Sequence, residues 1–249
     1  MSAMSHKSLL VFSHPNHEIA ILSLIENLKP TIIYLTDGGG EQRVSETRES
    51  LRRIGGGDRA HFLNHSEASF YQAILTRNAG FFRGVRDELV NAVAGQQIDA
   101  AFCDAVEFYN PVHDIALPVL VSAGLDVPLF EVPLIQQDYA GQIRMVTAPN
   151  GSTAETLEPS QAQKDRKLAF LSEVYVSLGR YLSGLSNLDV SYALQERYYP
   201  ARPLPIEPAA GEPIRYDARG KLLVEQGEYR EAITHAGNYR PLVRELLAA

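Results

Sequence analysis

Short apolar runs and amphipathic stretches alternate along the first half of the chain. The runs at 8–12 and 31–36 are almost continuously hydrophobic, which is typical of strands that are buried on both faces. Between them, apolar residues recur at roughly helical spacing over 16–28, and Pro30 closes that stretch. The N-terminal segment therefore predicts a strand, a helix and a second strand, which together form a βαβ unit.

The alternation continues as far as residue 132. The same periodicity predicts helices over 42–54, 67–76, 80–94 and 114–123. It predicts strands over 59–63, 98–103 and 127–132. Repeated alternation of strands and helices indicates an α/β fold, with a Rossmann-like, mostly parallel sheet flanked by helices.

The pattern weakens in the C-terminal part of the chain, beyond about residue 147. One long helix is predicted over 160–182, and a tract rich in proline and tyrosine follows over 198–216. Long irregular connections often serve a function, so this tract is either a lid or, as we favour, a packed irregular arm. We therefore expect a single α/β domain over 1–249, in which 1–150 form the sheet core and 151–249 an extended, irregular C-terminal half.

The charge and the cysteine content narrow the class of protein. Lys and Arg number 23 against 30 Asp and Glu, which gives a formal net charge of −7 and argues against a nucleic-acid partner. Cys103 is the only cysteine, so a disulfide framework and a multi-cysteine metal site are excluded, and its place at the end of a predicted buried strand favours a core role. No apolar run reaches the roughly 18 to 20 residues of a membrane span. We expect a cytoplasmic protein with neither a nucleic-acid nor a membrane partner; its oligomeric state stays open.

Three of the seven histidines follow the ends of predicted strands. In an open parallel sheet, the ligand site lies beyond the carboxyl ends of the strands. His14 and His17 follow the first strand, and His113 lies in the loop after the strand at 98–103. Three neutral imidazoles leave one position open on a tetrahedral zinc ion, which is the arrangement of a catalytic site. On spacing alone, His14 could equally cap the turn and His17 could be an ordinary first-turn residue of a helix.

Four segments around these residues form an ordered pattern. They read HPNHE at 14–18, LTDGG at 35–39, Arg43 with Glu46, Ser50 and Ile54-Gly55, and NPVH at 110–113. In order and spacing they resemble HPDDE, LTDGE, a helix of the form RxxE followed by a small residue and LG, and HPDH. Those are the motifs of the LmbE-like (PIG-L) family of metal-dependent N-deacetylases, and the resemblance spans roughly the first half of the chain.

The resemblance implies which residues hold a metal. His14 and His113 occupy the family's two histidine ligand positions, and His17 replaces its metal-binding aspartate. This implies a three-histidine site for Zn2+, with iron or another divalent metal as the alternative. Asn16 stands at the position of the family's general base, and an amide cannot accept a proton at neutral pH. Asn110 replaces a histidine that helps to stabilise the oxyanion, and its NH2 group can still donate to a developing negative charge.

Because Asn16 cannot act as the general base, another carboxylate would have to accept the proton. We favour Asp37 or Asp114 as the group that accepts or relays the proton. Replacing a carboxylate ligand by imidazole also raises the net charge of the metal site, which lowers the pKa of bound water and reduces the need for a strong base. Arg43 and Glu46 also have the spacing of a simple exposed ion pair within a helix. The residues expected to contact the substrate are Glu18, Arg43, Asp104, Glu107 and Tyr109.

The function that the resemblance implies is hydrolysis of an amide. Metal-bound hydroxide would remove an N-acyl group, first of all N-acetyl, from an amino sugar or a sugar-like metabolite. Two alternatives stay open. A three-histidine site also suits iron, which would indicate an oxygenase or a lyase that acts on a small biosynthetic intermediate. A relative that has lost its base would instead bind a metabolite without turnover.

Overall fold

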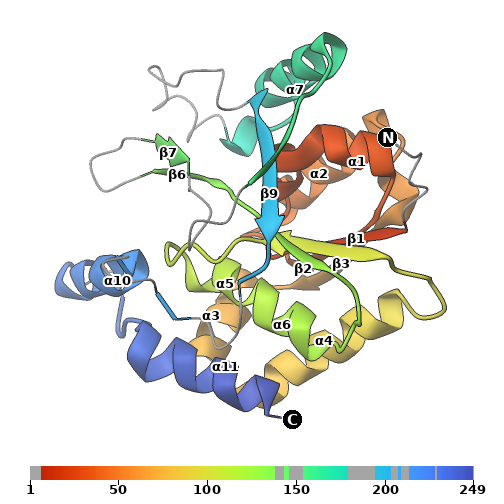
Figure 1. The fold of residues 1–249 in the computed structure, drawn as a ribbon. Coiled ribbons are helices and arrows are strands. Elements are labelled where there is room, and N and C mark those ends of the chain that lie inside the picture. Colours follow the sequence, from red (N-terminus) through yellow and green to blue (C-terminus); the bar gives the residue numbers. More distant parts are fainter. Residues whose placement is uncertain are drawn as a thin grey trace.

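The computed structural model describes residues 7–137, 143–145, 154–178, 194–202, 207–208, 213–227 and 229–248 (Figure 1). The strands are β1 (Ser8–Phe12), β2 (Thr31–Thr36), β3 (Ala60–His65), β4 (Ala100–Asp104), β5 (Leu129–Val132), β6 (Ile135–Gln137), β7 (Ile143–Met145), β8 (Glu155–Leu157) and β9 (Glu196–Pro200). The helices are α1 (Leu22–Leu28), α2 (Glu41–Arg53), α3 (Glu67–Leu75), α4 (Ala79–Ala92), α5 (Pro111–Asp114), α6 (Ala116–Ser122), α7 (Gln161–Glu173), α10 (Arg215–Glu225) and α11 (Arg240–Leu247). A 3-10 helix, η1 (His17–Ile21), precedes α1.

The main sheet has the strand order β3-β2-β1-β4-β5-β9-β8. Strands β1 to β5 run parallel, whereas β9 pairs antiparallel with β5, and β8 pairs antiparallel with β9. This confirms the predicted α/β fold with a mostly parallel sheet. The chain passes from β1 to β2 and β3, and then returns to β4 on the other side of β1. The strand order therefore reverses between β1 and β4, which creates a crevice at the carboxyl ends of these two strands.

Helices cover both faces of the sheet (Figure 1). Alternate residues of β1 face opposite ways: Leu9 and Val11 pack with α3, α4, α6 and α11, whereas Leu10 and Phe12 pack with η1, α1 and α2. All four side chains are fully buried. Burial on both faces thus explains why this strand is almost continuously apolar, as expected of a central parallel strand.

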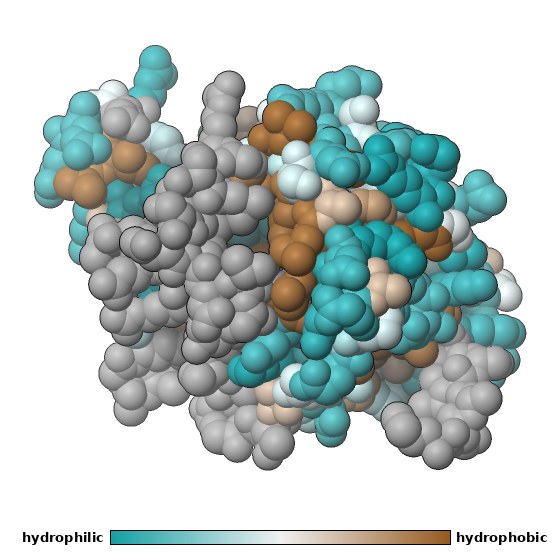
Figure 2. Space-filling model, turned by 90° about the horizontal axis from the view of Figure 1, so that it is seen from above, coloured by the Kyte–Doolittle hydropathy of each residue, from teal (hydrophilic) through white to brown (hydrophobic). Residues whose placement is uncertain are grey.

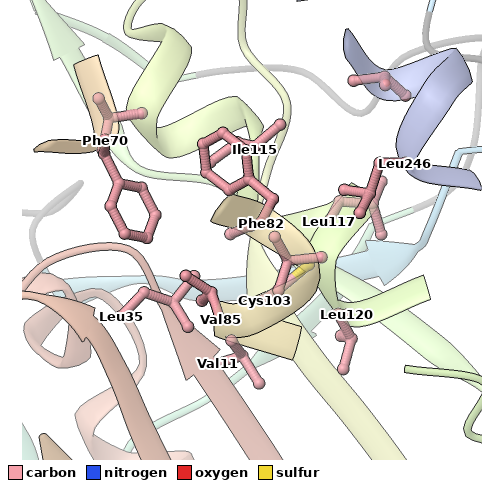
Figure 3. Close-up of a cluster of buried hydrophobic side chains, with 14 of the residues drawn as sticks. Val11, Leu35, Phe70, Phe82, Val85, Cys103, Ile115, Leu117, Leu120 and Leu246 are labelled. Carbon is pink, nitrogen blue, oxygen red and sulfur yellow. The ribbon is translucent and has the colours of Figure 1, made fainter. Parts of the chain in front are cut away.

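Cys103 belongs to the hydrophobic core on the α4 and α6 side of the sheet. Its side chain lies among Val11, Val85 and Leu117 (Figure 3). Burial raises the pKa of its thiol. The cysteine is therefore a small core residue, as its position in the sequence favoured.

We predict that a thiol reagent labels Cys103 only when the protein unfolds. The buried, protonated thiol reacts only through an opened state, so labelling in native buffer should be slow and should follow the rate of opening. In denaturant, the same thiol should react at once. Rapid labelling of the native protein, at the rate of an unstructured peptide thiol, would contradict this packing.

The C-terminal half contributes two strands to the main sheet, β8 and β9. The irregular tract predicted from residue 198 is wrong at 198–200, because these residues belong to β9, which pairs with β5 and β8, and Tyr199 is buried. It is also wrong at Arg215 and Tyr216, which begin α10. The helix predicted over 160–182 begins as expected but ends at Glu173. Residues 203–206 and 209–212 of the tract, and 179–182 of the predicted helix, lie outside the described residues.

In the coloured part of the surface seen from above, hydrophilic residues predominate, and hydrophobic residues show as a strip near the centre and as smaller groups on either side (Figure 2). In the described parts of the chain, the large apolar side chains that are exposed are Val90, Leu168, Val176, Leu222 and Tyr229. Singly exposed apolar residues of this kind are normal on globular proteins. None of the described helices has both the length and the apolar character needed to span a membrane.

Candidate metal centre

The side chains of His14, His17 and His113 meet at the carboxyl edge of the sheet. His14 lies in the loop after β1, His17 begins η1, and His113 lies in α5, which follows β4. The ring centres are 5.1 Å apart for His14 and His17, 4.8 Å for His14 and His113, and 4.6 Å for His17 and His113. The three rings therefore gather where the strand order reverses, between β1 and β4.

Hydrogen bonds fix how His14 presents its ring. Its Nδ1 atom is 2.7 Å from the Oγ1 atom of Thr36, the last residue of β2. The Thr36 hydroxyl donates its single proton to the Ser13 carbonyl, at 2.7 Å, so it accepts the hydrogen bond from His14 Nδ1. The lone pair of the neutral His14 ring then lies on Nε2, which is buried and has no hydrogen-bond partner among the described residues.

Asp104, the last residue of β4, holds His17. Both carboxylate oxygens are 3.0 Å from His17 Nδ1, and one of them also accepts hydrogen bonds from the backbone N–H and the hydroxyl of Ser13, at 2.7 and 2.5 Å. Burial raises the pKa of Asp104, but His17 and these hydrogen bonds outweigh burial and hold the pKa below its ordinary value. The Asp104 carboxylate is fully buried, and its contact with a substrate stays a prediction. In this structure it orients His17 and leaves the lone pair of that ring on Nε2.

His113 and His14 lie where a charged imidazolium would be poorly solvated. Burial lowers the pKa of both rings, and Arg43 lowers them further. Nδ1 of His113 is also buried, with no hydrogen-bond partner in the part of the chain that the structure describes. Two neutral rings thus carry buried nitrogens without a partner, a feature that a bound metal ion would explain.

The spacing of the three rings suits a single metal ion. Imidazoles bound to one tetrahedral zinc ion at about 2.1 Å have ring centres roughly 5 Å apart, close to the separations in this structure. Within the described residues, no three His, Cys, Asp or Glu side chains already form a metal-binding arrangement. A single ion bound to all three rings would need their free nitrogens closer together than they are in this structure.

Asn16 directs its side chain toward α2. Its backbone is left-handed, with a φ of 78°. The side-chain NH2 donates to Glu46, at 3.2 Å, and to Ser177, at 2.9 Å, while the side-chain oxygen accepts from the Thr47 hydroxyl, at 2.9 Å. All of its side-chain polar atoms are thus engaged within the protein. In this structure the Asn16 side chain joins the loop after β1 to α2, and its catalytic role stays a prediction.

We predict that Asn16→Asp, which restores the acid of the family motif, lowers stability without raising turnover. The new carboxylate loses its NH2 donors and stands beside the carboxylate of Glu46. We expect the free energy of unfolding to fall by about 1–3 kcal/mol, measured by denaturant unfolding. Asn91→Asp, at an exposed position of α4, is the matched control. A fully stable Asn16→Asp protein with raised turnover would contradict the orientation of this side chain.

Glu18 and Arg43 make their hydrogen bonds within the protein. Glu18 is fully buried and accepts a hydrogen bond from the Tyr175 hydroxyl, at 2.7 Å, and burial raises its pKa. Arg43 donates to the carbonyls of Gly38 and Pro15, at 2.9 Å each, which ties the loop after β2 to the loop after β1. In this structure Glu18 is a buried acid held by Tyr175, and its contact with a substrate stays a prediction. A substrate contact of Arg43 stays a prediction.

Asp37 and Asn110 are held by loops at the rim of the site. Asp37 Oδ1 accepts hydrogen bonds from the backbone N–H groups of Gly39, at 2.9 Å, and Glu67, at 3.1 Å. Asn110 is the N-cap of α5, where its side-chain oxygen accepts from the Val112 N–H, at 2.9 Å. Asp37 thus organises the rim through two backbone groups, and its role as a proton acceptor stays a prediction.

Asp114 and Glu107 belong to a buried group that extends toward β5. Asp114 Oδ1 accepts from the Glu107 N–H, at 3.0 Å, and Glu107 Oε1 accepts from the Leu134 N–H, at 2.9 Å. Burial raises the pKa of Asp114 well above its ordinary value, although Arg202 opposes this shift. Both carboxyl groups are buried, and the roles expected for them, as base and as substrate contact, stay predictions. Tyr109, between them in the chain, is half-buried, and its contact with a substrate stays a prediction.

Glu67, the first residue of α3, was not predicted from the sequence, yet it lies at this site. Its Oε1 atom is 3.6 Å from Nε2 of His14, and its side chain is 36% exposed. Burial raises its pKa and so does Asp37, while Arg43 and a hydrogen bond with the Asn110 side chain lower it. Its position just after a predicted strand was the signal that could have found it, because ligand sites lie at that edge of a parallel sheet.

Solved structures with a similar fold include deacetylases, although the sequence matches no protein-family model and no curated protein. The pseudoaglycone deacetylase of an antimicrobial reagent has 13% sequence identity, over 82% of this chain and 100% of that chain, with a TM-score of 0.58. A triple mutant of a deacetylase in the teicoplanin biosynthetic pathway has 14% identity, over 78% of this chain and 97% of its own, with a TM-score of 0.57. A zinc-inhibited form of teicoplanin deacetylase has 12% identity, over 78% and 97% of the two chains, with a TM-score of 0.53.

At these identities the similarity establishes the fold. The chain covers 97 to 100% of the length of these deacetylases. It therefore has their fold, which agrees with the resemblance to LmbE-like (PIG-L) deacetylases seen in four short sequence segments.

Proposed function

We propose that the protein is a metal-dependent hydrolase that removes an N-acyl group, first of all N-acetyl, from an amino sugar or a sugar-like small molecule. The observation that carries this proposal is the gathering of three imidazoles, two of them with buried, unpartnered nitrogens, at the crevice of a deacetylase fold. The solved structures of similar fold include deacetylases that act on a pseudoaglycone and in teicoplanin biosynthesis. Their chemistry supports an amide substrate here.

The residues that would hold the metal are His14 and His17 through Nε2 and His113 through Nδ1. Zinc, iron or another divalent ion bound there would polarise the amide carbonyl and lower the pKa of water. Hydrogen bonds at the other nitrogen orient two of these rings: Thr36 accepts from Nδ1 of His14, and Asp104 accepts from Nδ1 of His17. Partners of this kind fix the ring orientation and raise the basicity of the ligand nitrogen.

Other residues at the rim would stabilise the charge that develops on the substrate or hold the loops of the site in place. Asn110 caps α5 with its side-chain oxygen, and its NH2 group would serve as a donor for the negative charge that develops on the carbonyl oxygen. Arg43 and Asp37 hold the loops after β1 and β2 in place through backbone groups. The rim therefore keeps its shape without a substrate, as a preorganised site requires.

The test is a turnover assay on N-acetylated amino sugars, both free and attached to larger aglycones. We expect release of acetate and of the free amine in equal amounts, loss of both after chelation, and recovery when metal is restored. Metal should be added in steps up to about one equivalent, because one similar deacetylase was solved in a zinc-inhibited form. Tight binding of these compounds without release of acetate, with metal present, would contradict hydrolysis and indicate a metabolite-binding protein.

A further inference from the structure

The candidate site lacks a carboxylate at the position where the sequence pattern leads one to expect it. Asn16 stands there, and its side chain is bound to α2. On the opposite loop, residue 39 is a glycine with a φ of +92°, and a Cβ built there would lie 3.4 Å from Oε2 of Glu67. The carboxylate of Glu67 therefore lies in the space that a side chain at residue 39 would enter.

The backbone around Glu67 is fixed by the neighbouring loop. The Glu67 N–H donates to Asp37 Oδ1, at 3.1 Å, and the Asp37 N–H donates to the His65 carbonyl, at 2.8 Å. These contacts place Oε1 of Glu67 at 3.6 Å from Nε2 of His14, the nitrogen that has no other partner among the described residues.

Glu67 differs from the other acids near the histidines in its exposure. Its side chain is 36% exposed, whereas Glu18, Asp104 and Asp114 are fully buried. A substrate or a water molecule that enters from solvent can therefore reach Glu67 but not those three carboxyl groups. Asp37 is only partly buried, but its Oδ1 atom accepts two backbone hydrogen bonds and serves to hold the loop.

We propose that Glu67 is the catalytic carboxylate of the hydrolysis, in place of the acid that is absent at residue 16. This inference rests on the proposed function. As the water oxygen forms a bond to the amide carbon, one water proton passes to the Glu67 carboxylate. When the carbon–nitrogen bond breaks, that proton passes from Glu67 to the leaving nitrogen. The products are a carboxylic acid and a free amine, and Glu67 is again a carboxylate.

The test compares Glu67→Gln and Glu67→Ala with the wild type on an N-acetyl amino sugar that the wild type hydrolyses. We expect kcat to fall about 10²- to 10⁴-fold in both variants, with KM changed only a few-fold. Metal content and the metal dissociation constant, measured by chelator competition, should stay within about threefold of wild type. Glu41→Gln, which removes an exposed first-turn carboxylate from α2, is the matched control and should keep full activity.

A small external carboxylate provides a second readout. Formate fits the space left by Glu67→Ala but not the filled space in Glu67→Gln, so it should restore activity at least tenfold in the alanine variant alone. Retention of more than a third of wild-type kcat in Glu67→Gln would overturn the assignment. Loss of metal together with turnover would also overturn it and make Glu67 a ligand. Absence of amide hydrolysis by the wild type would instead overturn the proposed function, and this inference with it.

Discussion

His14→Ala is expected to lower kcat/KM for amide hydrolysis by about 10³-fold, because a metal site worth several kcal/mol to the transition state loses a ligand. The ring of His14 is held at Nδ1 by Thr36 and leaves a buried Nε2 without another partner in the described structure. Its neighbour rings lie within 5.1 Å, so its removal opens the centre of the cluster. Steady-state kinetics and metal analysis of the purified variant measure the two effects.

His61→Ala is the matched control for His14→Ala. His61 lies in β3, away from the three clustered rings, and its removal should change neither kcat/KM nor metal content. Circular dichroism and thermal unfolding of both variants report whether the fold is kept. A folded His14→Ala protein that keeps its metal and more than half of its activity would remove His14 from the ligand set.

Asp104→Asn should weaken metal binding about 10- to 100-fold, the usual cost of losing a carboxylate that orients a ligand histidine. The amide cannot accept from His17 Nδ1, Ser13 N–H and Ser13 hydroxyl together, because one of its two positions is now a donor. We also expect the free energy of unfolding to fall by about 1–3 kcal/mol, since a buried donor loses its acceptor. Chelator competition and denaturant unfolding measure the two changes.

Asp126→Asn, at an exposed position, is the matched control for Asp104→Asn. It removes the same charge from the surface and should leave both metal affinity and stability unchanged. Should Asp104→Asn bind metal as tightly as wild type while it loses stability, Asp104 would be only a structural acid beneath the loop. Unchanged values for both quantities would contradict the hydrogen bonds to His17 and Ser13.

The parallel core could be predicted from the sequence because burial on both faces leaves a continuous apolar signature. The strands at 8–12 and 31–36 have the predicted bounds. Strand β9 was missed, since its sequence ERYYP is charged and ends in proline. Its first residue, Glu196, is buried because Lys167 and the backbone of Ser23 and Leu24 bind its carboxylate. Partners so distant in the sequence cannot be read from local periodicity.

The three histidines could be predicted because the ends of parallel strands share one edge and the family motif marked the same positions. Glu67 was missed because the sequence predicted a strand that ends at residue 63, whereas β3 continues to His65. The residues that follow His65 were therefore not considered as part of the rim. The orientation of Asn16, Asp104 and Asp114 depends on which neighbour binds each side chain. Spacing along the chain carries no information about those contacts.

The central claim is a metal centre formed by His14, His17 and His113. The most direct test is elemental analysis of protein purified without added metal or affinity tag, in parallel with the His17→Ala variant. We predict about one zinc or iron ion per wild-type chain and none in a folded His17→Ala protein. Absence of metal from the wild type even after reconstitution, or an equal metal content in both proteins, would contradict the claim.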